Sequence, residues 1–188
     1  MVQSSIFSFG MCQTKSPLSR LRNGSTQLQE LDDIIKALLS QETVAHPKVY
    51  TSVMTAYSRQ RRWRGAMCVL DVMGQNKIEQ NVITSTAAIS ACEKGLEWQQ
   101  ALSLLRKFES QAVERNVTTC NAAIGACEKS VEWQQALALL DVLEAIGLEP
   151  QAITYTAAIN ACAKGAQWEL AIVVLQEMGC RGLQPNVI

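Results

Sequence analysis

Four tryptophans recur at an interval of 35 residues, and they constrain the fold of this chain more than any other feature. They are Trp63, Trp98, Trp133 and Trp168. The phrase TSTAAISACEKGLEWQQALSLL, which begins at Thr84, aligns with stretches that begin 35 residues later at Thr119 and again at Thr154. The stretch from Val49 to Leu70 is more divergent but keeps the spacing. A fixed period of this length is the signature of a solenoid, which builds an extended surface and not a closed pocket.

Each unit has the pattern of two helices. In the unit of residues 82–116, the expected first helix spans about Thr84 to Lys94, and Gly95 follows as a left-handed cap. The expected second helix starts near Trp98, and its apolar residues form one stripe of a 3.6-residue helix. We therefore predict an all-α fold, a right-handed α-solenoid (superhelix) of stacked antiparallel helix-turn-helix repeats. Because each tryptophan continues such a stripe, we interpret it as a packing wedge and not as a stacking platform for bases.

The period also divides the chain. We expect four repeats, at 47–81, 82–116, 117–151 and 152–186, with 187–188 as the start of a truncated fifth repeat. Residues 27–46 hold an amphipathic pattern that we interpret as a degenerate N-terminal capping helix. Residues 1–26 form a leader that we expect to be disordered. Its serines and basic residues, with no acid before Glu30, suit a transit peptide. A disordered leader without a targeting function explains them too.

Composition argues against several classes of protein. Cys92, Cys127 and Cys162 share the repeat period, no CxxC pair occurs, and His46 is the only histidine. We therefore expect buried, reduced thiols and no metal. The chain has no phosphate-binding glycine loop, no catalytic triad pattern and no apolar run long enough for a membrane span. We expect no enzymatic activity, no cofactor, no small-molecule substrate and no membrane association.

Polar residues recur on one face of every expected first helix, where burial alone would not select them. They are Thr51, Thr55, Arg59, Thr86, Ser90, Lys94, Asn121, Lys129, Thr156, Asn160 and Lys164. Spacings of four and eight residues keep them on one side of the helix. Stacked repeats would line their inner surface with hydroxyls, amides and a row of cations, which suits a ligand that needs hydrogen bonds.

Three phrases resemble pentatricopeptide repeats of the P type: TYTAAINACAKG in the first helix, WELAIVVLQEM in the second and GLQPN in the return loop. The resemblance covers Pro47 to Asn186. It implies sequence-selective binding of single-stranded RNA at about one base per repeat. It also implies a role in organellar RNA metabolism, that is, processing, stabilisation, splicing or translation. The expected location is the chloroplast or the mitochondrion, and otherwise the cytoplasm.

The resemblance assigns roles to individual residues. The fifth and last residues of a unit contact the base edge, and here these pairs are Thr51 with Asn81, Thr86 with Asn116, Asn121 with Gln151, and Thr156 with Asn186. An aliphatic second residue stacks on bases, which Ile83 and Ile153 fit and Lys48 and Thr118 do not. Backbone contacts fall to Arg59, Lys94, Lys129 and Lys164. In the family, Thr with Asn favours adenine and a fifth-position Asn favours pyrimidine, which implies 5′-A-A-(C/U)-A-3′. Gln151 departs from the usual Asn, Asp or Ser and leaves the third base open.

A protein-binding helical-repeat scaffold of the tetratricopeptide type is the alternative. Those repeats have 34 residues and bind peptides. The formal net charge of zero favours it. So does the acidic balance between Asn81 and Pro185, where eleven acidic residues stand against seven basic ones. The polar stripe with its row of cations favours RNA. The two interpretations differ in whether the cations and the polar pairs converge on one concave surface. Either interpretation allows protein partners.

Overall fold

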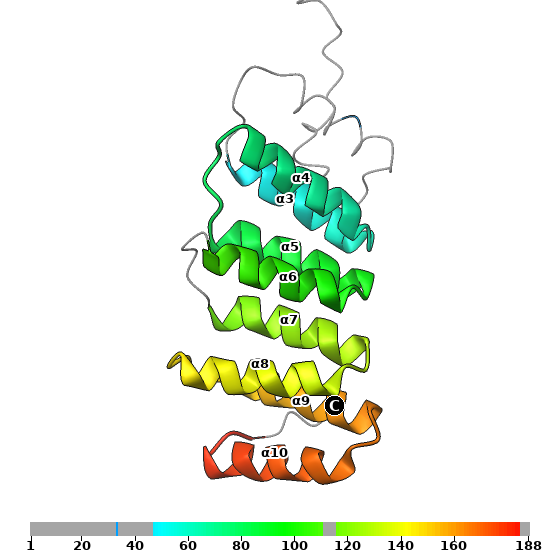
Figure 1. Cartoon of the computed structure of the whole chain (residues 1–188), viewed down its shortest axis with the longest axis vertical. Coiled ribbons are helices and arrows are strands. Elements are labelled where there is room, and N and C mark those ends of the chain that lie inside the picture. The colour runs from blue at the N-terminus through cyan, green and yellow to red at the C-terminus, as the bar shows by residue number, and fades with distance from the viewer. Residues whose placement is uncertain (1–32, 34–46, 111–115, 185–188) are drawn as a thin grey trace, which may run out of the picture.

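The computed structural model describes residue 33 and residues 47–110 and 116–184. From Pro47 onward these residues form helices that stack in pairs along one axis (Figure 1). The first helices of the pairs are α3 (Pro47–Arg59), α5 (Val82–Gly95), α7 (Val117–Lys129) and α9 (Ala152–Lys164). The second helices are α4 (Trp63–Gln75), α6 (Trp98–Ser110), α8 (Trp133–Ala145) and α10 (Trp168–Cys180). The predicted α-solenoid is confirmed. The expected leader, the capping helix and residues 187–188 lie outside the described residues, apart from Asp33.

The two sets of helices form different layers. Each first helix contacts the first helix of the next pair as well as its own second helix. Each of α4, α6 and α8 contacts the following first helix, but among the described residues no second helix contacts another. The first helices are therefore the closer-packed layer.

Asparagine side chains cap two of the first helices, α5 and α7. Asn81 Oδ1 accepts hydrogen bonds from the backbone N–H groups of Ile83 and Thr84, at 3.0 and 3.1 Å. Thr84 Oγ1 in turn accepts from the N–H of Asn81 at 2.9 Å, which completes a capping box. Asn116 Oδ1 accepts from the N–H of Thr119 at 2.7 Å. These caps satisfy backbone donors that the first turn of a helix leaves without partners.

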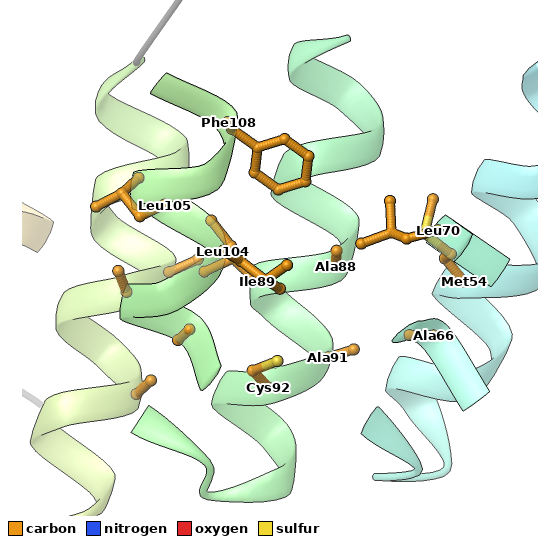
Figure 2. Close-up of a cluster of buried hydrophobic side chains, with 14 of the residues drawn as sticks. Met54, Ala66, Leu70, Ala88, Ile89, Ala91, Cys92, Leu104, Leu105 and Phe108 are labelled. Carbon is orange, nitrogen blue, oxygen red and sulfur yellow. The ribbon is translucent and has the colours of Figure 1, made fainter. Parts of the chain in front are cut away.

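Small side chains let the first helices approach one another. Ala88, Ala91 and Cys92 are completely buried, and Ile89 fills the space between α5 and its neighbours (Figure 2). The larger side chains around them come from the adjacent helices, as the labelled Met54, Leu70 and Phe108 show. The period-related Cys92, Cys127 and Cys162 are free and buried, as predicted. Burial raises the pKa of the Cys92 and Cys127 thiols to about 12, so both stay protonated at neutral pH.

The tryptophans connect successive repeats, as the packing-wedge interpretation predicted. The ring of Trp63 lies against Gly95 at the end of α5, and the ring of Trp133 lies against Gly165 after α9. A Cβ atom on Gly95 would come within 2.7 Å of Trp63 Cδ1. Trp168, on α10, is 65% exposed. Trp98 also packs against the core, although Ser130 stands where the neighbouring repeats have Gly95 and Gly165, so the wedge forms where a described first helix follows.

The prediction that Gly95 is the left-handed cap was wrong. Gly95 is the last residue of α5, and Leu96 adopts the left-handed conformation with φ of 63°. Arg61, Val131 and Ala166 have positive φ at the equivalent positions of the other pairs. The reason is steric: Gly95 provides room for the Trp63 ring, and the turn comes one residue later.

No helix in the described part of the chain is long and apolar enough to cross a membrane. Within the same residues, no three His, Cys, Asp or Glu side chains are grouped so that they could hold a metal ion.

Candidate nucleic-acid interface

Thr51, Thr86, Asn121 and Thr156 are each the fifth residue of a first helix, and all four are half-buried. The threonine hydroxyls reach back to the carbonyl oxygen four residues earlier: Thr51 to Pro47 at 3.2 Å, Thr86 to Val82 and Thr156 to Ala152 at 2.7 Å. A hydroxyl that donates its proton inside the helix still offers its lone pairs to a ligand. These threonines can therefore accept hydrogen bonds from outside the protein.

Two of the expected base-reading pairs meet at junctions between repeats. Thr86 and Asn116 both contact the hydroxyl of Thr119: the Thr86 Oγ1 to Thr119 Oγ1 distance is 2.8 Å, and the Thr119 Oγ1 to Asn116 Oδ1 distance is 2.6 Å. The structure thus brings together two side chains that are 30 residues apart in the sequence.

The second junction brings Asn121 and the backbone N–H of Gln151, not the Gln151 side chain, to Thr154. Its hydroxyl donates to Asn121 Oδ1 at 2.6 Å and accepts from the backbone N–H of Gln151 at 3.0 Å. The other two pairs are less complete. Asn81 is exposed and caps α5, but the Thr84 hydroxyl bonds the backbone of Asn81 and the Thr51 hydroxyl bonds the Pro47 carbonyl, so Thr84 does not join this pair. Asn186, the partner expected for Thr156, lies outside the described residues.

Sequence reasoning missed the buried hydroxyls of Thr84, Thr119 and Thr154, of which Thr119 and Thr154 join the expected base-reading pairs. They are almost completely buried, with exposed fractions of 0%, 3% and 0%. Each is the third residue of its first helix, where a hydroxyl can bond the preceding cap. A signal was available: a threonine recurs at this position in three of the four repeats, although a solvent-shielded position would ordinarily take an apolar side chain.

Two large apolar side chains are exposed at the same end of the first helices. Ile83 is 65% exposed and Ile153 is 58% exposed, and both are the second residue of their helix. Lys48 and Thr118 occupy the equivalent positions and are also exposed. Packing does not account for an isoleucine with most of its surface in water. An aliphatic surface of this kind can lie flat against a base.

The expected backbone-contacting cations lie in the last turn of the first helices. Arg59, Lys94, Lys129 and Lys164 are all exposed. Two of them form ion pairs with the preceding repeat: Lys129 Nζ lies 2.6 Å from Glu93 Oε1, and Lys164 Nζ lies 2.9 Å from Glu128 Oε1.

Lys94 differs because the residue 36 positions before it is the buried Ser58. Lys94 makes no ion pair with any residue that the structure describes. Exposed pairs such as those of Lys129 and Lys164 contribute little to stability, so a phosphate could replace either carboxylate at small cost. The polar pairs, the exposed isoleucines and the cations thus all belong to the layer of first helices. The cations lie at the C-terminal ends of these helices, and the caps lie at the N-terminal ends.

Comparison with known proteins gives a consistent result. A family model described as pentatricopeptide repeat-containing protein matches residues 22–141, and a second, described as pentatricopeptide repeat domain, matches residues 138–188. A search of the curated proteins found no match.

Solved structures of similar fold include two crystal structures of the pentatricopeptide repeat protein PPR10. The structure in complex with an 18-nucleotide psaJ RNA element is 21% identical, with a TM-score of 0.72 over 90% of this chain and 27% of that one. The structure of the protein from maize is 25% identical, with a TM-score of 0.73 over 90% of this chain and 24% of that one. This chain therefore spans about a quarter of the length of these structures.

Proposed function

The chain belongs to the pentatricopeptide repeat family, and we therefore propose that it binds single-stranded RNA in a sequence-selective manner, at about one base per repeat. The observation that carries this proposal is the junction geometry. Each pair comes from one repeat and meets at a buried hydroxyl of the next repeat: Thr86 with Asn116 at Thr119, and Asn121 with the backbone of Gln151 at Thr154. A base edge placed at the first of these junctions would meet the side chains of both Thr86 and Asn116. The RNA bound in one of the PPR10 crystal structures supports the same class of ligand.

The chemistry of the pairs supports particular bases. Adenine presents an amino donor and a ring-nitrogen acceptor on its Watson–Crick edge. Thr86 offers an acceptor, and the amide nitrogen of Asn116 offers a donor, so together they complement adenine. Asn121 offers an amide donor that suits the carbonyl oxygen of a pyrimidine. The proposed footprint is 5′-A-A-(C/U)-A-3′, and Ile83 and Ile153 would stack on the bases beside them.

The proposal extends to the cellular role. The serine-rich leader without acids before Glu30 and the family membership favour a role in RNA metabolism of the chloroplast or mitochondrion. A peptide-binding scaffold of the tetratricopeptide type is the alternative. The convergence of cations and polar pairs on one layer favours RNA over that alternative.

The contribution of the cations is testable through salt dependence. We expect Lys94→Gln to weaken RNA binding and to reduce the slope of log affinity against log salt by about 0.7, the value for one lost phosphate contact on a single strand. The triple variant of Lys94, Lys129 and Lys164 should reduce it by about 2. Fluorescence anisotropy over a range of salt concentrations measures both slopes.

Lys107→Gln is the matched control, because Lys107 is an exposed cation on α6, in the other layer. It should leave the slope unchanged. An equal reduction by Lys107→Gln would mean that RNA does not follow the first helices.

A further inference from the structure

We propose that Thr154, and with it Thr119, is a positioning residue that sets base selectivity by fixing the orientation of a base-reading amide across the repeat junction. This inference rests on the proposed RNA-binding function and adds residues to it. Both threonines are buried, so neither can touch RNA directly. Each acts through the side chain that it holds.

The hydrogen bonds of the Thr154 hydroxyl define the orientation of the Asn121 amide. The backbone N–H of Gln151 can only donate, and it donates to Thr154 Oγ1 at 3.0 Å. The hydroxyl proton of Thr154 goes to Asn121 Oδ1 at 2.6 Å. The amide oxygen of Asn121 therefore faces into the protein, and its Nδ2 group is left to face a ligand. A ligand meets a donor at this position and not an acceptor.

The hydrogen bonds of Thr119 likewise define which groups of Asn116 and Thr86 face a ligand in the second repeat. Asn116 Oδ1 accepts from both the N–H and the hydroxyl of Thr119, at 2.7 and 2.6 Å, which leaves the Nδ2 group of Asn116 as the outward donor. Because the Thr119 proton is used there, Thr86 must give its own proton to Thr119 Oγ1 or to the Val82 carbonyl. In either case Thr86 can only accept from a base.

The consequence is a fixed polarity at each junction. Asn121 shows a donor, which both pyrimidines can accept through their carbonyl oxygen at position 2 and which the amino group of adenine cannot accept. If the amide could rotate by 180°, it would show an acceptor and could bind the amino group of adenine equally well. The buried hydroxyl thus converts an adaptable amide into a selective one, and each junction is read by three residues instead of two.

The test compares Thr154→Val, which keeps the shape and removes the hydroxyl, with Thr154→Ser, which restores it. Binding is measured to four RNAs that differ at the third base of the proposed footprint. We expect Thr154→Val to reduce the preference for pyrimidine over adenine by about three- to tenfold, the effect of one lost hydrogen bond. Thr154→Ser should retain the wild-type preference.

Thr84→Val is the matched control. Thr84 is equally buried at the same helix position, but its hydroxyl bonds the backbone of Asn81, and the Thr51 hydroxyl bonds Pro47. This variant should lower thermal stability without changing selectivity at the first base. The inference is overturned if Thr154→Val weakens binding to all four RNAs by one common factor, or if Thr154→Ser loses selectivity as Thr154→Val does. Absence of RNA binding by the wild-type chain would instead remove the proposed function itself, and the inference with it.

Discussion

Replacing Trp133 by alanine is expected to lower the free energy of unfolding by about 3 kcal/mol, the lower end of the range for loss of a packed aromatic side chain. Trp133 is half-buried, and its ring fills the space above Gly165 in the next repeat. No residue between the repeats can replace that ring, because Gly165 has no side chain. Denaturant titration followed by circular dichroism measures the change.

The chain supplies its own control for this experiment. Trp168 stands 35 residues after Trp133 at the start of α10, but 65% of its surface is exposed. We expect Trp168→Ala to change the free energy of unfolding by about 0.5 kcal/mol or less, as for most surface positions. Trp133→Ala should also broaden the transition, since stability in a repeat array depends on the interfaces between neighbours. Equal effects of the two substitutions would show that the tryptophans stabilise their own helices and do not join repeats.

Thr86→Asn is expected to reverse the base preference of the second repeat from adenine to pyrimidine. Asparagine at this position can accept from the Thr119 hydroxyl, as Asn121 accepts from Thr154 in the next repeat. It would then present an amide donor in place of the acceptor of Thr86. If each preference is about tenfold, as one or two hydrogen bonds allow, the ratio of affinities changes by about a hundredfold. Competition binding between AACA and AUCA RNAs measures that ratio.

Ser90→Asn controls for the added amide, since Ser90 lies one turn further along the same helix and is also half-buried. The control should keep the preference for AACA. If Thr86→Asn kept it as well, the fifth residue of the first helix would have no part in reading the base, and the assignment of all four pairs would fail.

The repeat period was sufficient to predict the helix pairs, the packing role of Trp63 and Trp133, and the burial of Cys92 and Cys127. Each of these depends on the spacing of apolar or small side chains within a unit, which the sequence displays directly. The period also made Thr86 and Asn116 candidates through the resemblance to a known family. Their meeting at a junction could not be derived from spacing.

Contacts between repeats depend on the angle at which one unit packs on the next, and a linear pattern does not contain that angle. The adjacent residues Glu93 and Lys94 suggest a solvated helix end, yet Glu93 pairs with Lys129 in the following repeat. The buried hydroxyls of Thr119 and Thr154 were missed for the same reason. Gly95 suggested a cap because the glycine rule considers one chain segment, whereas the ring that requires this glycine comes from another repeat.

Fluorescence anisotropy of the purified chain with short labelled RNAs tests the central claim most directly. The RNAs contain AACA or GGUG, and a DNA strand of the AACA sequence is measured beside them at low and moderate salt. We predict tighter binding to the AACA RNA than to either other strand, with a preference that persists when salt weakens all three. Equal affinity for AACA and GGUG, or no binding by a chain that circular dichroism shows to be helical, would contradict the account.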